Sequence, residues 1–182
     1  MVFAPDTEAN LRAAADLVNT GRRRDGHDAL GTVADLDAFY SGWGYTTRHD
    51  HDDDELAQVR AARSRLGSLW TLERDAVADE VNAILREAHA VPYLVRHGST
   101  DWHLHATVPD APLSTVMLVE TAMAAADVVR SDEWDRMRTC EADDCTAVLV
   151  DLSRNRSRRF CDANNCGNRA HVAAYRARRT GD

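Results

Sequence analysis

The residues best suited to chemistry are four cysteines in the last quarter of the chain. Cys140 and Cys145 form one Cys-x4-Cys pair, Cys161 and Cys166 form a second, and the chain has no other cysteine. Four thiolates at two short spacings can complete a tetrahedral shell around one Zn²⁺. A complete shell leaves no open position for a substrate, so the ion would be structural. We therefore predict one structural zinc ion and look for the function in what it holds in place.

Other uses of the cysteines stay open on the sequence alone: disulfides, a redox switch, buried free thiols or an iron–sulfur cluster. The N-terminus, MVFAPDTEANLRAAADL, lacks the basic start and apolar core of a secretory signal. No apolar run approaches the roughly 20 residues of a membrane span, so we expect no membrane partner. We therefore expect a cytoplasmic protein. In that reducing compartment paired cysteines bind metal more often than they form disulfides.

Positive charge gathers around the cysteines. The 22 basic residues are all arginines, and the formal net charge of the chain is −8. Residues 1–139 carry 24 acidic and 14 basic side chains, whereas residues 153–180 carry eight arginines and one carboxylate, Asp162. A local basic patch is the electrostatic footprint that nucleic acid requires, whatever the net charge of the whole chain.

The elements that would position these residues are mostly helices. Apolar residues recur at helical spacing, which predicts helices over residues 8–19, 33–43, about 55–70, 75–89 and 113–129. The acidic run 50–55 suits the start of the third helix, because carboxylates complement the positive end of the helix dipole. Residues 91–108 alternate like a β-hairpin with a turn at His97-Gly98-Ser99.

The cysteine module has its own pattern. A short helix over residues 133–138 leads into it, residues 146–152 predict a strand, and residues 158–160 predict the returning strand. The run after Cys166 is strongly helical. A knuckle, a hairpin and a helix that carries the last ligand together resemble a treble clef.

The same residues resemble a known family. Cys140-x4-Cys145, the stretch 151–161 and Cys166-Gly-Asn-Arg169 are similar to the CGNR zinc finger. In that family an ABATE domain precedes the finger, and here Leu17-Val-Asn-Thr20 and Val81-Asn82 resemble its signatures. Two residues depart from the finger pattern. Phe160 stands where tryptophan is usual, and His171 where lysine or arginine is common.

The resemblance implies a two-domain α+β chain that regulates transcription. We expect a mainly helical ABATE-like domain with one β-hairpin over residues 1–132 and a treble-clef-like zinc finger over residues 133–182. The finger would bind DNA, and the N-terminal domain would sense a signal or dimerise. Because one finger makes few phosphate contacts, a homodimer is the natural way to gain affinity.

Arginines are the candidate DNA contacts, since the guanidinium fork matches phosphate oxygens. Arg169 and Arg176 lie seven residues apart, hence on one helix face, and Arg179 extends that face. Arg158 and Arg159 are neighbours on the predicted strand, so they point to opposite faces. The candidate DNA-binding residues are Arg154, Arg156, Arg158, Arg159, Arg169, Arg176 and Arg179.

Polar residues within the N-terminal helices suggest a second kind of site. Asn19, Thr20 and Asn82 interrupt apolar stripes and could line a pocket for a small-molecule effector; helix capping and an internal hydrogen bond explain them as well. His103 and His105 share a strand face, and His49-Asp50-His51 could bind a cation, but a packed strand face and a solvated helix start are the simpler interpretations.

No sequence motif for catalysis is present, so we expect no enzyme. Two alternatives to a DNA-binding regulator remain. One is a zinc-stabilised protein-interaction module, and the other is a small-molecule-binding N-terminal domain without DNA binding.

Overall fold

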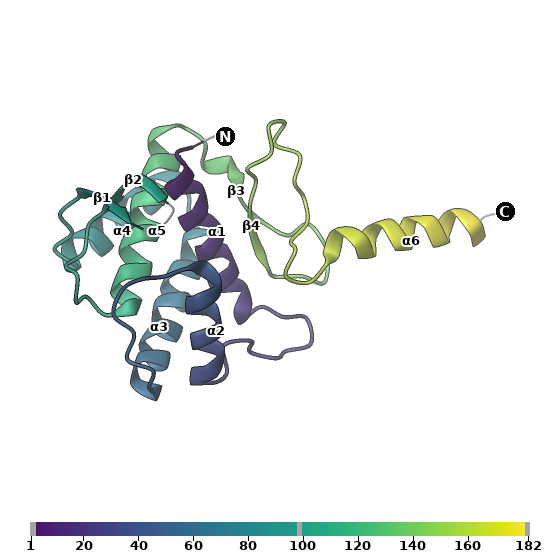
Figure 1. Ribbon diagram of the computed structural model, residues 1–182. Coiled ribbons are helices and arrows are strands. Elements are labelled where there is room, and N and C mark those ends of the chain that lie inside the picture. Colours follow the sequence, from purple (N-terminus) through teal and green to yellow (C-terminus); the bar gives the residue numbers. More distant parts are fainter. Residues whose placement is uncertain (1–2, 98–99, 181–182) are drawn as a thin grey trace.

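The computed structural model describes residues 3–97 and 100–180. Five helices and a hairpin precede the cysteine module (Figure 1). In order, these are α1 (Pro5–Thr20), α2 (Val33–Trp43), α3 (Asp53–Leu69), α4 (Arg74–Glu87), β1 (Tyr93–His97), β2 (Thr100–His105) and α5 (Leu113–Arg130). The module then contains a 3-10 turn η1 (Trp134–Arg136), β3 (Met137–Thr139), β4 (Val148–Val150) and α6 (Cys166–Thr180). The predicted α+β class is confirmed.

Helix α5 is the centre of the N-terminal part, with α1, α3 and α4 packed around it (Figure 1). Its buried Leu113, Met117 and Val119 join a core to which every helix from α1 to α5 contributes. Small residues let the helices approach closely: Ala122, Ala124 and Ala125 of α5 are all buried. Each large apolar side chain buried here contributes about 1.5–3 kcal/mol to folding.

Local signals set the helix starts. The Thr32 hydroxyl accepts from the backbone N–H of Asp35 while the Asp35 carboxylate accepts from that of Thr32, which is a capping box before α2. Asp52 caps α3 by accepting from the N–H of Glu55 at 2.8 Å. The acidic run therefore opens the third helix, as predicted from the sequence.

Strands β1 and β2 form the predicted antiparallel hairpin, with Tyr93 opposite His105 and Leu94 opposite Leu104. The predicted turn residues Gly98 and Ser99 lie outside the described residues. Leu94 and Trp102 are exposed, so part of the hairpin surface faces solvent.

Two predictions for the cysteine module are wrong. The predicted helix over residues 133–138 is only the turn η1, after which the chain extends as β3. Residues 158–160 form no strand; β4 pairs with β3 instead, with Met137 opposite Val150 and Thr139 opposite Val148. The backbone N–H of Arg158 donates to the Asp151 carboxylate, and the carbonyl of Arg159 accepts from the N–H of Glu141, so this segment does not form a ladder with β4.

The small β3–β4 sheet also packs on the helical part, where β4 lies along α1 (Figure 1). Met137, Val148 and Val150 are buried in the same core as α1 and α5. The sheet of the cysteine module thus lies in the main core, whereas Cys140, Ala147, Cys161 and Cys166 form a separate buried cluster. None of the helices within residues 3–97 and 100–180 has both the length and the apolar character needed to cross a membrane.

Candidate metal centre and the arginines around it

Secondary structure brings the four cysteines together. Cys140 directly follows β3, and its N–H donates to the carbonyl of Ala147 at 2.8 Å, which extends the β3–β4 ladder. Cys145 ends the knuckle, with its N–H bonded to the carbonyl of Ala142. Cys161 lies in the loop after β4, and Cys166 is the first residue of α6. The end of a strand, a knuckle, a loop and the start of a helix therefore converge on one point.

The sulfur positions fit one tetrahedral zinc ion. All four Sγ atoms lie within 4.8 Å of one another. The Cys145–Cys161 and Cys161–Cys166 Sγ–Sγ distances are both 3.7 Å. Zinc–sulfur bonds of about 2.3 Å in a tetrahedron place the sulfurs about 3.8 Å apart. The four cysteines are thus suited to bind one zinc ion, as predicted.

Hydrogen-bond donors point at the sulfurs, which is how structural zinc sites share the charge of their thiolates. The N–H of Cys161 donates to Cys140 Sγ at 3.4 Å, the Asn164 amide to Cys145 Sγ at 3.3 Å, and the Arg169 guanidinium to Cys166 Sγ at 3.4 Å.

The thiols themselves have shifted pKa values. Burial raises the pKa of Cys166 to about 11 and also raises that of Cys161. Burial acts in the same direction on Cys145, but hydrogen bonds from the Ala147 backbone and the Asn164 amide lower its pKa to about 7. Four thiolates packed this closely need a cation between them, because only a positive charge offsets their burial and mutual repulsion.

The apolar support around the sulfurs is small. The buried cluster of the module consists of Cys140, Ala147, Cys161 and Cys166, with Phe160 and a few small side chains against it. A cluster of this size is far below what an independent hydrophobic core needs. A zinc ion held by the four cysteines would therefore add stability that this cluster cannot supply by itself.

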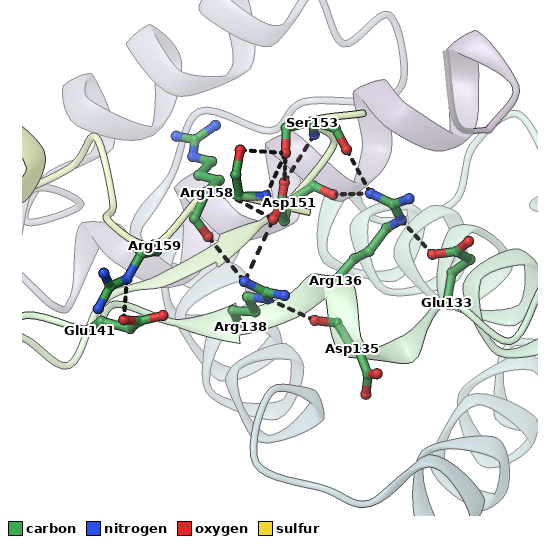
Figure 2. A network of polar contacts seen from close by, with 10 residues as sticks. Glu133, Asp135, Arg136, Arg138, Glu141, Asp151, Ser153, Arg158 and Arg159 are labelled. Atoms are coloured by element: carbon green, nitrogen blue, oxygen red, sulfur yellow. Dashed lines mark hydrogen bonds and ion pairs between the residues drawn. The ribbon is translucent and has the colours of Figure 1, made fainter. Parts of the chain in front are cut away.

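A polar network holds the loop that leads from β4 to Cys161 (Figure 2). Asp151 is 0% exposed, and its carboxylate accepts from the N–H and hydroxyl of Ser153 and from the N–H of Arg158. Burial raises the pKa of Asp151, but these hydrogen bonds and the charge of Arg138 hold it below its usual value. The buried Arg136 side chain donates to the carbonyls of Asp151 and Ser153 and pairs with Glu133.

Two protein-family models together match nearly the whole chain. Residues 136–179 match the CGNR zinc finger. Residues 11–132 match the family described as ABATE, "putative stress-induced transcription regulator". The chain belongs to the ABATE family. No curated protein matches the sequence, and neither family description names an enzyme.

Asn19 joins the ABATE segment (residues 11–132) to the CGNR segment (residues 136–179) by hydrogen bonds. The Asn19 amide donates to the carbonyl of Val148 and accepts from its N–H, both at 2.8 Å. The indole N–H of Trp70 donates to the carbonyl of Leu149 at 3.1 Å. The register of the sheet turns the N–H and C=O of Val148 away from β3, so Asn19 satisfies a strand edge that would otherwise be buried and unpaired.

The three polar residues predicted as pocket liners are not brought together. Asn19 bonds to β4, Thr20 donates to the carbonyl of Leu17 and accepts from Arg63, and Asn82 is exposed on α4. Asn19 lies beside a cavity of about 120 Å³, but its amide already holds Val148. A larger cleft of the ABATE segment, of about 330 Å³, is lined by other residues.

The loop after α1 makes a second set of contacts with the CGNR segment, which could not be predicted from the sequence. Asn164, between the third and fourth cysteines, donates to the carbonyl of Arg22 and accepts from the N–H of Arg24. The Arg23 side chain donates to the carbonyl of Ala163, and Arg24 pairs with Asp144. The one sequence signal for these contacts is the run of three arginines after α1. Their charge does not predict that they bond to backbone carbonyls.

Four of the seven candidate DNA contacts have carboxylate partners. Arg156 pairs with Glu133 at 2.8 Å, Arg159 with Glu141 at 2.5 Å, Arg169 with Asp144 at 2.9 Å, and Arg158 with Asp162. Arg179 lies over the ring of Tyr175, and Arg176 is exposed on α6. Arg154 is exposed, and within the described residues it has no carboxylate partner.

The seven arginines do not form one surface. The loop with Arg154 and Arg156 lies at the opposite end of the CGNR segment from the start of α6 (Figure 1). Near Cys166, the groove beside α6 is walled by Glu141, Asp143 and Asp144. Arg169 and Arg176 of α6 line the same groove, whereas Arg178 and Arg179 lie in the last turn of the helix.

Proposed function

We propose that the chain is a DNA-binding transcription regulator in which zinc fixes the base of α6 and the outer turns of α6 contact DNA phosphates. The observation that supports this most is the helix itself. Figure 1 shows α6 extending away from the rest of the molecule, and residues 171–179 are all exposed. An exposed helix of about four turns that extends from the molecule can contact a partner outside the chain.

The phosphate contacts that we propose are those of the outer helix. Arg178 and Arg179 lie in the last turn of α6, and Arg176 lies just before it, at the outer end of the groove that Glu141, Asp143 and Asp144 also line. Arg169 is a positioning residue instead, because its guanidinium bonds both Cys166 Sγ and Asp144. Two or three contacts per chain give weak binding, so we propose that a dimer binds DNA.

The cleft of the ABATE segment is the proposed place for the signal. It has a volume of about 330 Å³ and lies between α1, the hairpin and α5. Glu120 lines it, and burial, with a smaller effect from Asp6, raises the pKa of this carboxyl to about 7. A ligand with a cationic or hydrogen-bond-donating group would suit these acidic walls.

Fluorescence anisotropy with labelled genomic DNA fragments tests the proposal. For the zinc-loaded protein we expect affinity to fall steeply with salt, and Arg176→Ala with Arg179→Ala should lower the salt slope by up to about 2. The matched control, Arg86→Ala with Arg130→Ala, removes the same charge from the ABATE segment and should bind as the wild type does. An absence of binding at low salt, or an equal loss in the control, would overturn the proposal.

One observation favours a second candidate, a zinc-stabilised protein-interaction module. Val172 and Tyr175 are 40% and 55% exposed on α6, and four of the arginines already have carboxylate partners. Apolar side chains on an exposed helix suit a protein partner better than phosphate. Salt-independent capture of a protein through Tyr175, without DNA binding, would favour this function.

A further inference from the structure

We propose a second metal site in the ABATE segment, formed by Asp37, His49 and His51, that takes a divalent transition ion such as Zn²⁺. Asp37 lies on α2, and the two histidines lie on the loop between α2 and α3. Their three ligand atoms lie within 4.8 Å of one another. This site shares no residue with the four cysteines and does not depend on DNA binding.

The distances suit ligands of one ion. Asp37 Oδ1 lies 2.9 Å from His49 Nε2 and 2.9 Å from His51 Nδ1. The two imidazole rings face each other with centroids 3.9 Å apart. Metal–ligand bonds of about 2.1 Å place neighbouring ligand atoms about 3 Å apart at the right angles of an octahedral ion and about 3.4 Å apart at the tetrahedral angle of zinc, so small shifts of the exposed Asp37 and His51 side chains cover both geometries. Two imidazoles and one carboxylate form a set that zinc, iron and nickel accept.

His49 supplies the independent observation. Its side chain is only 5% exposed, yet its Nε2 atom has no hydrogen-bond partner. The nearby Asp37 oxygen, at 2.9 Å, lies outside hydrogen-bond geometry. A buried ring nitrogen without a donor or acceptor is costly, and a metal ion would use its lone pair.

Glu55 fixes the ring of His49 in the way that metal-binding histidines require. Glu55 Oε2 lies 2.6 Å from His49 Nδ1, and because a carboxylate only accepts, the Nδ1–H donates. The lone pair then resides on Nε2, which faces Asp37 and His51. The carboxylate–histidine–metal arrangement is the usual second shell of such sites. The backbone N–H groups of Asp50 and His51 also donate to Glu55 Oε2, so Glu55 fixes the conformation of residues 49–51.

The open side of the site faces solvent. The side chains of Asp37 and His51 are 42% and 61% exposed, so water can complete the coordination. A bound ion would link α2 to the loop before α3 and thereby hold residues 45–47, which line the 330 Å³ cleft. The site therefore also offers a way for metal to stiffen one wall of that cleft.

Metal content after equilibrium dialysis of the full chain against Zn²⁺ tests the site. We expect two zinc ions per wild-type chain and one in Asp37→Asn and in His51→Ala. These two variants change exposed side chains and avoid unfolding of the buried His49. The matched control is His103→Ala, because His103 and His105 bring their Nε2 atoms within 3.1 Å on β2; it should keep two ions.

Each other result counts against the site. One ion in the wild type, or two ions in both variants, would overturn the proposal. Loss of the second ion in His103→Ala but not in His51→Ala would place that ion on β2 and overturn it equally. As an independent readout, added Zn²⁺ beyond one equivalent should raise the thermal midpoint of the wild type and not that of His51→Ala.

Discussion

The ABATE and CGNR segments are held together by different forces. Residues 11–132 surround α5 with a continuous apolar core, whereas the cysteine site of the CGNR segment has a buried cluster of four small side chains, three of them cysteines. Between them, β3 and β4 belong to the CGNR match but are buried in the ABATE core. From this comparison we infer that the outer part of the finger needs the metal, whereas its sheet is held by the apolar core.

The largest effect should follow from removing one ligand. Cys166→Ser opens the zinc shell, and structural zinc contributes about 10–16 kcal/mol to the folding of small fingers. We expect residues 151–180 to become sensitive to protease while the ABATE segment stays folded, as measured by limited proteolysis and metal content. Ala142→Ser, beside the same cluster, is the control and should keep its zinc. A zinc-free Cys166→Ser protein with a resistant α6 would contradict the comparison.

The next effect concerns the join between the segments. Asn19→Ala leaves the buried N–H and C=O of Val148 unpaired, and each unsatisfied group costs about 1–3 kcal/mol. We expect the free energy of unfolding in urea to fall by about 2–4 kcal/mol. Asn82→Ala, exposed on α4, should change it by less than about 0.5 kcal/mol. Equal effects of the two changes would mean that Asn19 does not join the segments.

A smaller, pH-dependent effect tests the ABATE cleft. The pKa of Glu120 is raised from 4.5 to about 7 in the folded state, so the folded protein holds the proton more tightly than the unfolded chain. Stability therefore falls as pH rises from about 4.5 to 7. Glu120→Gln should match the wild type near pH 4.5 and exceed it by about 2–3 kcal/mol at pH 8 in urea unfolding. A stability difference between the two proteins that does not change with pH would contradict a raised pKa of Glu120 in the folded state.

Much of the fold could be predicted because its signals are local. The apolar periodicity placed α1 to α5, and the acidic run placed the start of α3. The partner of β4 could not be predicted, because Met137–Thr139 is only three residues long and the packing of β4 on α1 joins segments far apart in the sequence. The wrong strand at residues 158–160 shows how a single carboxylate, Asp151, can take the N–H that a ladder would use.

The candidate sites also divide into those that local sequence predicts and those that depend on contacts between distant residues. The four cysteines could be predicted from spacing, since their chemistry is specific and they lie within 27 residues of sequence. The role of Asn19 could not, because its partner Val148 is 129 residues away. His49 and His51 were visible as a pair, but Asp37 and Glu55 join them only through the packing of α2 on α3.

Hydrogen exchange of the zinc-loaded and chelator-treated protein tests the difference between the segments most directly. We predict that chelation removes protection from α6 and from residues 151–166, while the amides of α1, α5 and β4, including Val148, keep theirs. Loss of protection throughout the chain would contradict this, because zinc would then support the ABATE core as well. Unchanged protection in α6 would contradict it too, because the outer finger would then be stable without its metal.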